Sequence, residues 1–97
     1  MKIVSHKKLV DFYSKHHTSK IPLENWYKTA KCAKWKNFAD IKKDFNSTDA
    51  IGNQRYIFNI KGNDYRLVVI IQFAHEYLYI RFVGSHSEYD KIDSNTI

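Results

Sequence analysis

The spacing of apolar residues changes once along the chain, close to residue 50. Before that point, apolar residues recur every three or four positions, which is the spacing of a helix with one buried face. After it they alternate or run together, with many β-branched and aromatic residues, as in strands. Helices followed by strands indicate an α+β domain, in which the helices pack on one face of an antiparallel sheet.

Three helices are expected in the first half. The first covers roughly residues 6–17 with Ser5 as its cap, the second has Pro22 in its first turn, and the third covers about 37–45. Residues 46–53 are rich in Asn, Ser, Asp and Gly and are typical of a loop.

Three strands are expected in the second half, at residues 56–60, 65–73 and 77–83. The segments between them are the size of turns, so the strands form an antiparallel meander. Ile3-Val4 could add a short edge strand. The expected fold is a small antiparallel sheet, a three-strand meander with this possible edge strand, covered on one face by two to three N-terminal helices.

A chain of 97 residues has material for one compact domain, so residues 1–97 are expected to form a single domain. No apolar run reaches the length that crosses a membrane, and no export signal is visible. The lone Cys32 excludes an internal disulfide and fits a reducing compartment. We therefore expect a cytoplasmic protein that does not contact a membrane.

Positive charge is unevenly distributed. Sixteen Lys or Arg against ten Asp or Glu give a formal net charge of +6, which favours a polyanion as partner. Residues 1–45 hold eleven lysines and four acids, which is typical of a solvated helical surface. All three arginines lie in the strand half, and a guanidinium group is a rigid match to phosphate.

Side chains on a strand alternate between the two faces of a sheet, and this alternation brings the arginines together. With four-residue loops, the expected pairs are Asn59 with Arg66, Arg55 with Ile70, Ile70 with Arg81 and Arg66 with Ser85. The resulting face carries Arg55, Arg66, Arg81 and Tyr79, with Ser85-His86 at its edge. Tyrosines beside arginines suit single-stranded nucleic acid, whereas the alternative is an ordinary solvated face. A one-residue slip of register would break the pattern.

The strand half also carries an ordered set of motifs. They are Tyr56-Ile57-Phe58-Asn59-Ile60, Gly62-Asn63, Tyr65-Arg66-Leu67-Val68, Tyr79-Ile80-Arg81-Phe82-Val83 and Ser85-His86-Ser87-Glu88-Tyr89-Asp90-Lys91. This set resembles the HigB family of RelE-like toxins from bacterial type II toxin–antitoxin modules, over about residues 55–91. Two departures are visible, because Ser85 stands where many relatives have Thr and Lys61 where Gly is frequent.

The resemblance implies a RelE-like fold and an mRNA interferase, an endoribonuclease that cuts mRNA and inhibits translation. Such toxins typically act in the ribosomal A site, beside 16S ribosomal RNA. The resemblance also implies a HigA-type antitoxin with a helix-turn-helix domain, so that operator DNA is reached only through the antitoxin complex. The alternative is a non-catalytic module that binds RNA or the ribosome through the same basic face.

Cleavage of RNA by its own 2′-hydroxyl requires a base, an acid and stabilisation of the phosphorane charge, and it requires no cofactor. We expect Arg66 and Arg81 at the phosphate and His86 as general acid or base. Tyr89 would stack on a base or assist proton transfer. The alternatives are a salt bridge to a tail carboxylate for the arginines, a capping role for His86 and core packing for Tyr89.

Further RNA contacts are expected from Arg55, Lys61, Tyr79 and Lys91, with a plain surface role as the alternative for the lysines and for Arg55. No set of His, Cys or carboxylates is spaced for a metal, because His16 and His17 are adjacent on a helix and diverge. The large aromatic residues of the helical half are candidates for the core or for contact with the antitoxin; they are Trp26, Trp35 and Phe38.

Overall fold

The computed structural model describes residues 1–97. Along the chain the elements are β1 (Lys2–Val4), α1 (Lys7–Tyr13), η1 (His17–Ser19), α2 (Lys20–Cys32), α3 (Phe38–Asp44), β2 (Thr48–Gly52), β3 (Arg55–Ile60), β4 (Tyr65–Gln72), η2 (Phe73–His75), β5 (Tyr77–Ser85) and α4 (His86–Tyr89). The strands form one sheet in the order β1-β5-β4-β3-β2, in which β1 is parallel to β5 and the other neighbours are antiparallel. The predicted α+β class and the edge strand at the N-terminus are confirmed.

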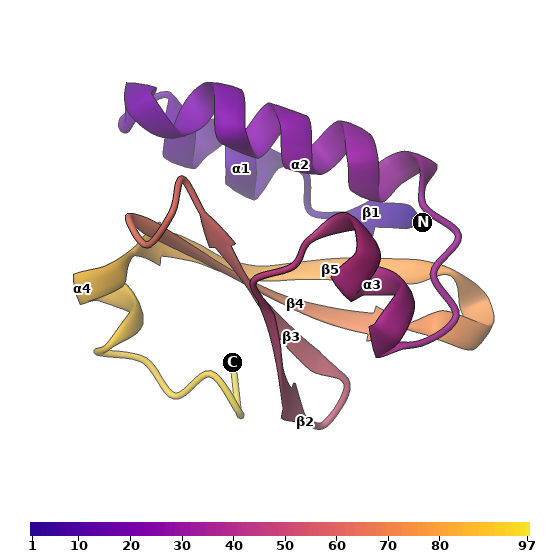
Figure 1. Ribbon diagram of the computed structural model, residues 1–97. Helices are drawn as coiled ribbons and strands as arrows, with labels where there is room; N and C mark the ends of the chain where they lie inside the picture. The colour runs from indigo at the N-terminus through magenta and orange to yellow at the C-terminus, as the bar shows by residue number, and fades with distance from the viewer.

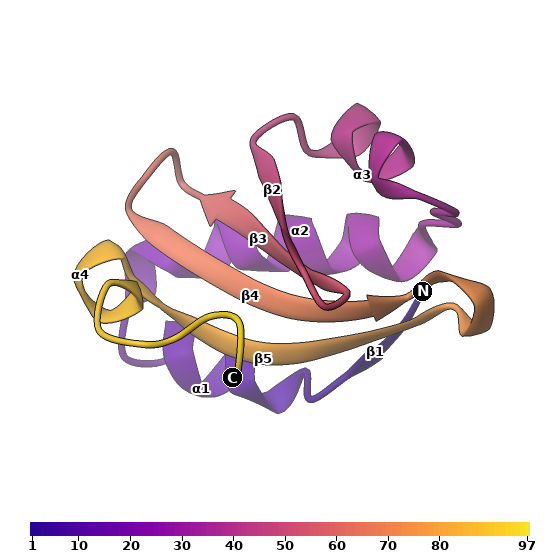
Figure 2. The same ribbon diagram turned by 90° about the horizontal axis from the view of Figure 1, so that it is seen from below.

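The helices and the C-terminal segment lie on opposite sides of the sheet. α1 and α2 run side by side across one face, and α4 with the residues after it lies on the other (Figure 1; Figure 2). No helix is both long enough and apolar enough to cross a membrane. The two faces of the sheet therefore have different roles, one in the core and one toward the C-terminal segment.

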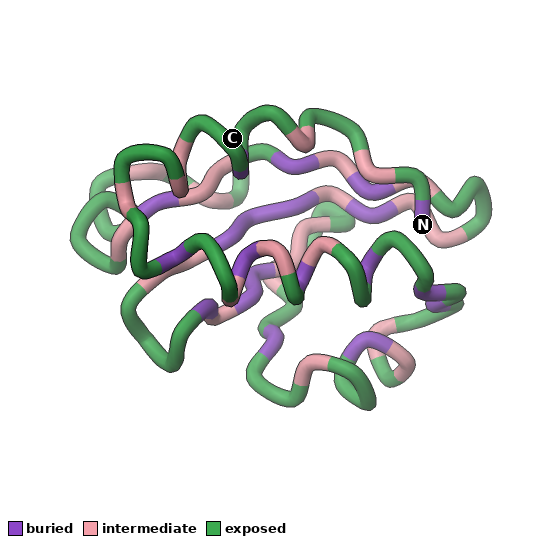
Figure 3. The backbone as a smooth tube through the Cα atoms, turned by 90° about the horizontal axis from the view of Figure 1, so that it is seen from above, coloured by how far each residue is buried: buried purple, intermediate pink, exposed green.

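The apolar stripe of α2 packs on the sheet as its spacing predicts. Leu23, Trp26 and Ala30 are buried, and Figure 3 shows buried positions recurring along the helices and filling the central strands. Pro22 stands in the first turn, although α2 begins two residues earlier, at Lys20. The expected cap of α1 is wrong, because Ser5 has a left-handed backbone (φ 72°) and makes no cap, and α1 ends at Tyr13.

An aromatic cluster forms the centre of the main core. The ring of Phe58 on β3 lies 5.3 Å from the rings of both Trp26 and Phe45, between centroids. Trp35 is also buried, and its indole nitrogen donates to Asp44 at 2.8 Å. Both tryptophans are therefore core residues. Phe38 packs at the margin of the same core.

One strand and one short helix were not expected from the sequence. β2 pairs with β3 inside the segment that was expected to be a loop, and it forms an edge of the sheet. Its Asp49 and Gly52 have low strand propensity, so pairing with β3 rather than local preference makes this segment extended. α4 begins immediately after β5, where only a tail was expected.

The register of the first hairpin is as predicted, whereas that of the second is wrong. Asn59 pairs with Arg66 and Arg55 with Ile70. In the second hairpin the turn begins at Phe73 rather than Ala74, and Glu76 adopts a left-handed backbone (φ 59°). The observed pairs are Ile70 with Tyr79, Val69 with Ile80, Val68 with Phe82 and Arg66 with Gly84.

A β-bulge at Arg81 accounts for the changed faces of β5. Arg81 lies between two paired residues and has no partner of its own on β4. Leu78 and Ile80 face the main core before the bulge, whereas Phe82 pairs with Val68 on the opposite face after it. The prediction that Phe82 belongs to the core face is therefore wrong.

Candidate functional site

The sheet face opposite the main core carries two of the three arginines. Arg55 lies on β3 and Arg66 on β4, and Tyr79 pairs with Ile70, the β4 partner of Arg55. Ile57 and Val68 are also on this face, yet they are only 4% and 0% exposed. The centre of this face is therefore covered, and the ordinary solvated face that was the alternative does not describe it.

Phe82 lies over Gly84 on the same face. A Cβ added to Gly84 would be 2.5 Å from Cζ of Phe82, which is closer than real Cβ atoms approach, and it would also make a tight contact of 3.2 Å with Cβ of Glu88. Glycine at this position therefore leaves room for the Phe82 ring. Because Gly84 pairs with Arg66, the ring and this arginine are neighbours at the same end of the sheet.

The guanidinium group of Arg66 is held by backbone carbonyl groups and has no acidic partner. Its Nη1 donates to the carbonyl oxygen of Asn63 at 3.2 Å, and the carbonyl oxygen of Tyr65 is 3.5 Å away. No ion pair includes Arg66 or Arg81, so the alternative of a salt bridge to a tail carboxylate is wrong. Arg66 keeps its charge available at the surface.

α4 is fixed at its start by a reciprocal capping box. The hydroxyl of Ser85 accepts from the backbone nitrogen of Glu88 (3.2 Å), and Glu88 Oε1 accepts from the backbone nitrogen of Ser85 (2.8 Å). This backbone hydrogen bond from Ser85 lowers the pKa of the Glu88 carboxyl, and the positive charges of His16 and Lys91 act in the same direction. The cap is Ser85, so the capping alternative for His86 is wrong.

His86 and Tyr89 lie on this short helix close to the end of β4. The backbone nitrogen of His86 donates to the carbonyl oxygen of Asp64 at 3.1 Å, which connects α4 to the turn whose Asn63 carbonyl accepts from Arg66. His86 Nδ1 is 3.2 Å from Asp90 Oδ2. The Tyr89 hydroxyl is half-buried and lies 3.3 Å from Ser94 Oγ. The structure therefore brings His86 and Tyr89 to the same end of the sheet as Arg66.

The other expected RNA contacts are more dispersed. Arg55 donates from Nε and Nη2 to the carbonyl oxygen of Ile97, at 3.2 and 2.8 Å, and its register places it about 13 Å along β3 from the partner of Arg66. Tyr79 stacks on Tyr77, with ring centroids 5.9 Å apart, near Arg55. Lys61 lies in the β3–β4 turn, 3.7 Å from Asp64, and Lys91 follows α4.

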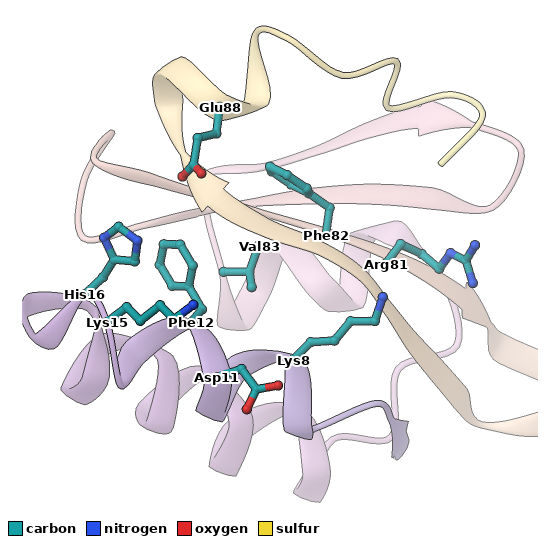
Figure 4. A pocket seen from close by; sticks show the side chains of 9 residues that line it. All are labelled: Lys8, Asp11, Phe12, Lys15, His16, Arg81, Phe82, Val83 and Glu88. Carbon is teal, nitrogen blue, oxygen red and sulfur yellow. The ribbon is translucent and has the colours of Figure 1, made fainter.

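Arg81 does not share the face of Arg66, contrary to the prediction. The bulge turns it to the outer edge of β5, where it lines a groove of about 420 Å³ between α1 and β5. We call this the α1–β5 groove; its lining residues are Lys8, Asp11, Phe12, Lys15, His16, Arg81, Phe82, Val83 and Glu88 (Figure 4). Lys8 and Arg81 stand at one end of the view, and His16 and Glu88 at the other.

Apart from Arg81, none of these groove residues was a functional candidate from the sequence. Lys8, Lys15 and His16 recur at helical spacing beside Phe12 in the sequence, although only Lys8 and Phe12 are on α1 and the other two follow it. Nothing in the sequence places these residues against β5, because the contact depends on how the helix crosses the sheet. Glu88 was expected only as part of the tail motif and as a possible salt-bridge partner of the arginines.

The arrangement supplies the groups that phosphodiester chemistry needs. It combines guanidinium groups without acidic partners, an imidazole beside a carboxylate and a half-buried phenol. No group of three or more His, Cys, Asp or Glu side chains is placed to hold a metal ion.

Comparisons with known proteins place the chain among bacterial toxins. Residues 19–92 match the family model for the HigB toxin, described as the RelE-like toxic component of a toxin–antitoxin system. The chain is 33% identical over 95 residues to the mRNA interferase toxin HigB of Escherichia coli (strain K12), covering 93% of this chain and 88% of that protein. The mRNA interferase HigB of Shigella flexneri matches equally. A further mRNA interferase HigB, from Escherichia coli O6:H1 (strain CFT073), is 22% identical over 94 residues, which cover 95% of this chain and 91% of that protein.

Proposed function

The chain belongs to the HigB family of RelE-like toxins, as its motifs indicated, and we propose from this that it is an mRNA interferase whose residues 1–97 act as one toxin domain. As the toxic component of a toxin–antitoxin system, it has an antitoxin as its partner. The proposed activity is endoribonucleolytic cleavage of mRNA, which stops translation. The observation that carries the proposal is the gathering of Arg66, His86 and Tyr89 where β4 meets α4.

The proposed chemistry is attack of the RNA 2′-hydroxyl on the adjacent phosphorus. A base removes the hydroxyl proton, the 2′-oxygen bonds to phosphorus, and an acid protonates the 5′-oxygen as its bond to phosphorus breaks. The products are a 2′,3′-cyclic phosphate and a free 5′-hydroxyl, and no cofactor enters the balance. His86 is the group suited to one of the two proton transfers, because Asp90 contacts Nδ1 and leaves Nε2 available.

Arg66 is suited to stabilise the charge that develops on the phosphorane. Its contacts with carbonyl oxygens orient the guanidinium group without neutralising it, so the positive charge is in place before the substrate arrives. Arg81 would reach the RNA from the outer edge of β5 rather than from the same face. Lys61 and Lys91 lie in segments that adjoin α4 and would add weaker contacts to phosphates.

The tyrosines are suited to hold bases rather than phosphates. Tyr89 on α4 would stack against the base beside the cleaved linkage or assist proton transfer. Tyr79, stacked on Tyr77, offers a second aromatic surface farther along the sheet, with Arg55 nearby. This spacing fits an extended RNA strand that lies along the sheet.

The finer partners follow from the family and remain part of the proposal. We expect a HigA-type antitoxin with a helix-turn-helix domain, contact with operator DNA only through the antitoxin complex, and cleavage in the ribosomal A site near 16S ribosomal RNA. An enzyme with these partners works in the cytoplasm.

Mapping mRNA ends on translating ribosomes tests the proposed function. The purified protein is incubated with ribosomes and a defined message, and new 5′ ends are located by primer extension, with Arg66→Ala as the inactive control. New ends that recur at defined codon positions would support the enzyme. Ribosomes that stall on an intact message would instead establish the non-catalytic binding module.

A further inference from the structure

The α1–β5 groove has three cations without partners. Lys8 on α1, Lys15 in the turn that follows α1 and Arg81 in the bulge make no side-chain hydrogen bond and no ion pair, and all three are exposed. Elsewhere on α1, Lys7 does pair with an acid, Asp11, at 3.0 Å. The groove therefore has free positive charge on both of its sides.

The two carboxylates of the groove are already engaged. Asp11 accepts from Lys7, and Glu88 accepts from the backbone nitrogen of Ser85 in the capping box of α4. Each of these two carboxylates therefore already has a partner within the protein, Lys7 for Asp11 and the Ser85 backbone for Glu88. An anion that enters the groove therefore meets Lys8, Lys15 and Arg81 with little competition.

Flat aromatic rings line the groove between its charges. The rings of Phe12 and His16 stack with centroids 4.2 Å apart and planes at 18°. Tyr65 contacts the edge of Phe12 at 5.5 Å between centroids, and its hydroxyl lies 2.6 Å from Thr18 Oγ1, which fixes the ring pair against the sheet. Phe82 lines the same groove from β5. Rings of this kind stack on nucleobases.

We propose that the α1–β5 groove binds a segment of single-stranded RNA that flanks the cleaved linkage. Phosphates lie at Lys8, Lys15 and Arg81, and a base lies against the paired rings of Phe12 and His16. The groove volume of about 420 Å³ is within the range of pockets that enclose small ligands, so it accommodates one nucleotide with its phosphate. This inference rests on the proposed function, because it places the RNA relative to that cleavage site.

The groove continues the Arg66 site around the edge of the sheet. Phe82 lies over Gly84, the partner of Arg66, and it also lines the groove. An RNA strand that leaves Arg66 therefore crosses β5 at Phe82 and enters the groove beside Arg81. The combination of free cations with stacking surfaces favours RNA over an acidic peptide, which needs the cations alone.

Binding of an uncleavable RNA tests the groove separately from catalysis. The probe is a short fluorescein-labelled 2′-O-methyl RNA, whose blocked hydroxyl cannot attack, and binding is followed by fluorescence anisotropy. The test variant is Lys8→Gln with Lys15→Gln, and the matched control is Lys28→Gln with Lys36→Gln, two exposed lysines away from the groove. The expected result is about tenfold weaker binding for the test variant, with a slope against log salt reduced by about 1.4, or about 0.7 per phosphate contact.

If the two double variants weaken RNA binding equally, the proposal that RNA binds in the groove is contradicted. Weaker binding of the antitoxin by the test variant with unchanged RNA affinity would also contradict it, and would assign the groove to the antitoxin. A second readout is photocrosslinking from 4-thiouridine in the probe. We expect the crosslink in the α1 peptide that contains Phe12 and His16, and crosslinks confined to β3 and β4 would overturn the inference.

The two levels of the proposal fail in different ways. If new mRNA ends appear as expected but the groove variant binds the probe as well as its control, the nuclease activity is supported and the proposed RNA contact in the groove is contradicted. If no new mRNA ends appear although the groove variant binds the probe more weakly than its control, RNA binding in the groove is supported and the proposed nuclease activity is contradicted.

Discussion

His86 Nδ1 lies 3.2 Å from Oδ2 of Asp90, the residue that follows α4, and the two side chains are 52% and 59% exposed. A contact between side chains this exposed adds little to the free energy of unfolding. Its effect is on orientation, because a carboxylate at Nδ1 fixes the ring and directs Nε2 outward. The pair thus matters for chemistry more than for stability.

Replacing His86 is expected to slow cleavage without weakening RNA binding. His86→Gln removes proton transfer by the imidazole, which is worth on the order of a hundredfold in rate or more. Asp90→Asn keeps the ring but weakens its orientation, so its effect is smaller. Single-turnover cleavage on ribosomes measures both, and a wild-type rate in His86→Gln would make His86 a structural residue.

Removing either free arginine is expected to abolish growth inhibition in cells that lack the antitoxin. Arg66→Ala loses the charge that faces the phosphorane, and Arg81→Ala loses the phosphate contact at the β5 edge. Lys28→Ala is the control for loss of one exposed positive charge. Growth curves at matched protein levels give the result, and full toxicity of both arginine variants would refute the site.

The capping box of α4 is expected to stabilise the fold by about 1 kcal/mol. Ser85→Ala removes the hydroxyl that accepts from Glu88, while Ser87→Ala removes an exposed hydroxyl on the same helix that makes no hydrogen bond. Urea unfolding compares the two variants with the wild type. An equal loss in both would show that the cap is not the cause.

Lowering the pH is expected to reduce the contribution of Glu88 to the free energy of unfolding. The pKa of this carboxyl is lowered in the folded protein, chiefly by the hydrogen bond from Ser85, so its stabilising effect is present above the pKa of the unfolded state. The effect disappears as the pH falls through the lower folded value. Urea unfolding from neutral pH to below pH ~4 should show a steeper loss for the wild type than for Glu88→Gln.

The centre of the aromatic core is expected to carry much of the stability. Phe58→Ala leaves a cavity between Trp26 and Phe45 and should cost about 3–5 kcal/mol in the free energy of unfolding. Ile21→Ala removes an apolar side chain that is 70% exposed and should change it by about 0.5 kcal/mol or less. If the two variants lost similar amounts of unfolding free energy, Phe58 would not be at the centre of the core.

Local patterns predicted most of the fold because they reflect burial. The stripe of α2 and the alternation of β3 and β4 are present in the sequence, and the turn at residues 61–64 fixes the register of Asn59 with Arg66. The register of β5 could not be predicted in this way. It depends on the left-handed backbone of Glu76 and on the bulge at Arg81, and neither residue type indicates such a conformation.

The sequence predicted which residue types form the candidate site better than it predicted where those residues lie. Arg66, His86 and Tyr89 come together because β4 and α4 adjoin at one end of the sheet. Arg81 was assigned to the wrong side by one unpaired residue, since every bulge reverses the faces that follow it. The groove partners on α1 depend on the packing of a helix against a distant strand, which spacing alone does not encode.

The pairing of β1 with β5 also determines when the protein can become harmful during its own synthesis. The first strand has no neighbour in the sheet until residues 77–79 have been made, and Arg81 with α4 follows still later. Because β5 provides this pairing, the sheet is completed only after β5 has been synthesised. A nascent chain that stops before β5 therefore lacks both the completed sheet and the residues Arg81 and His86, so no active toxin forms until these segments have been synthesised.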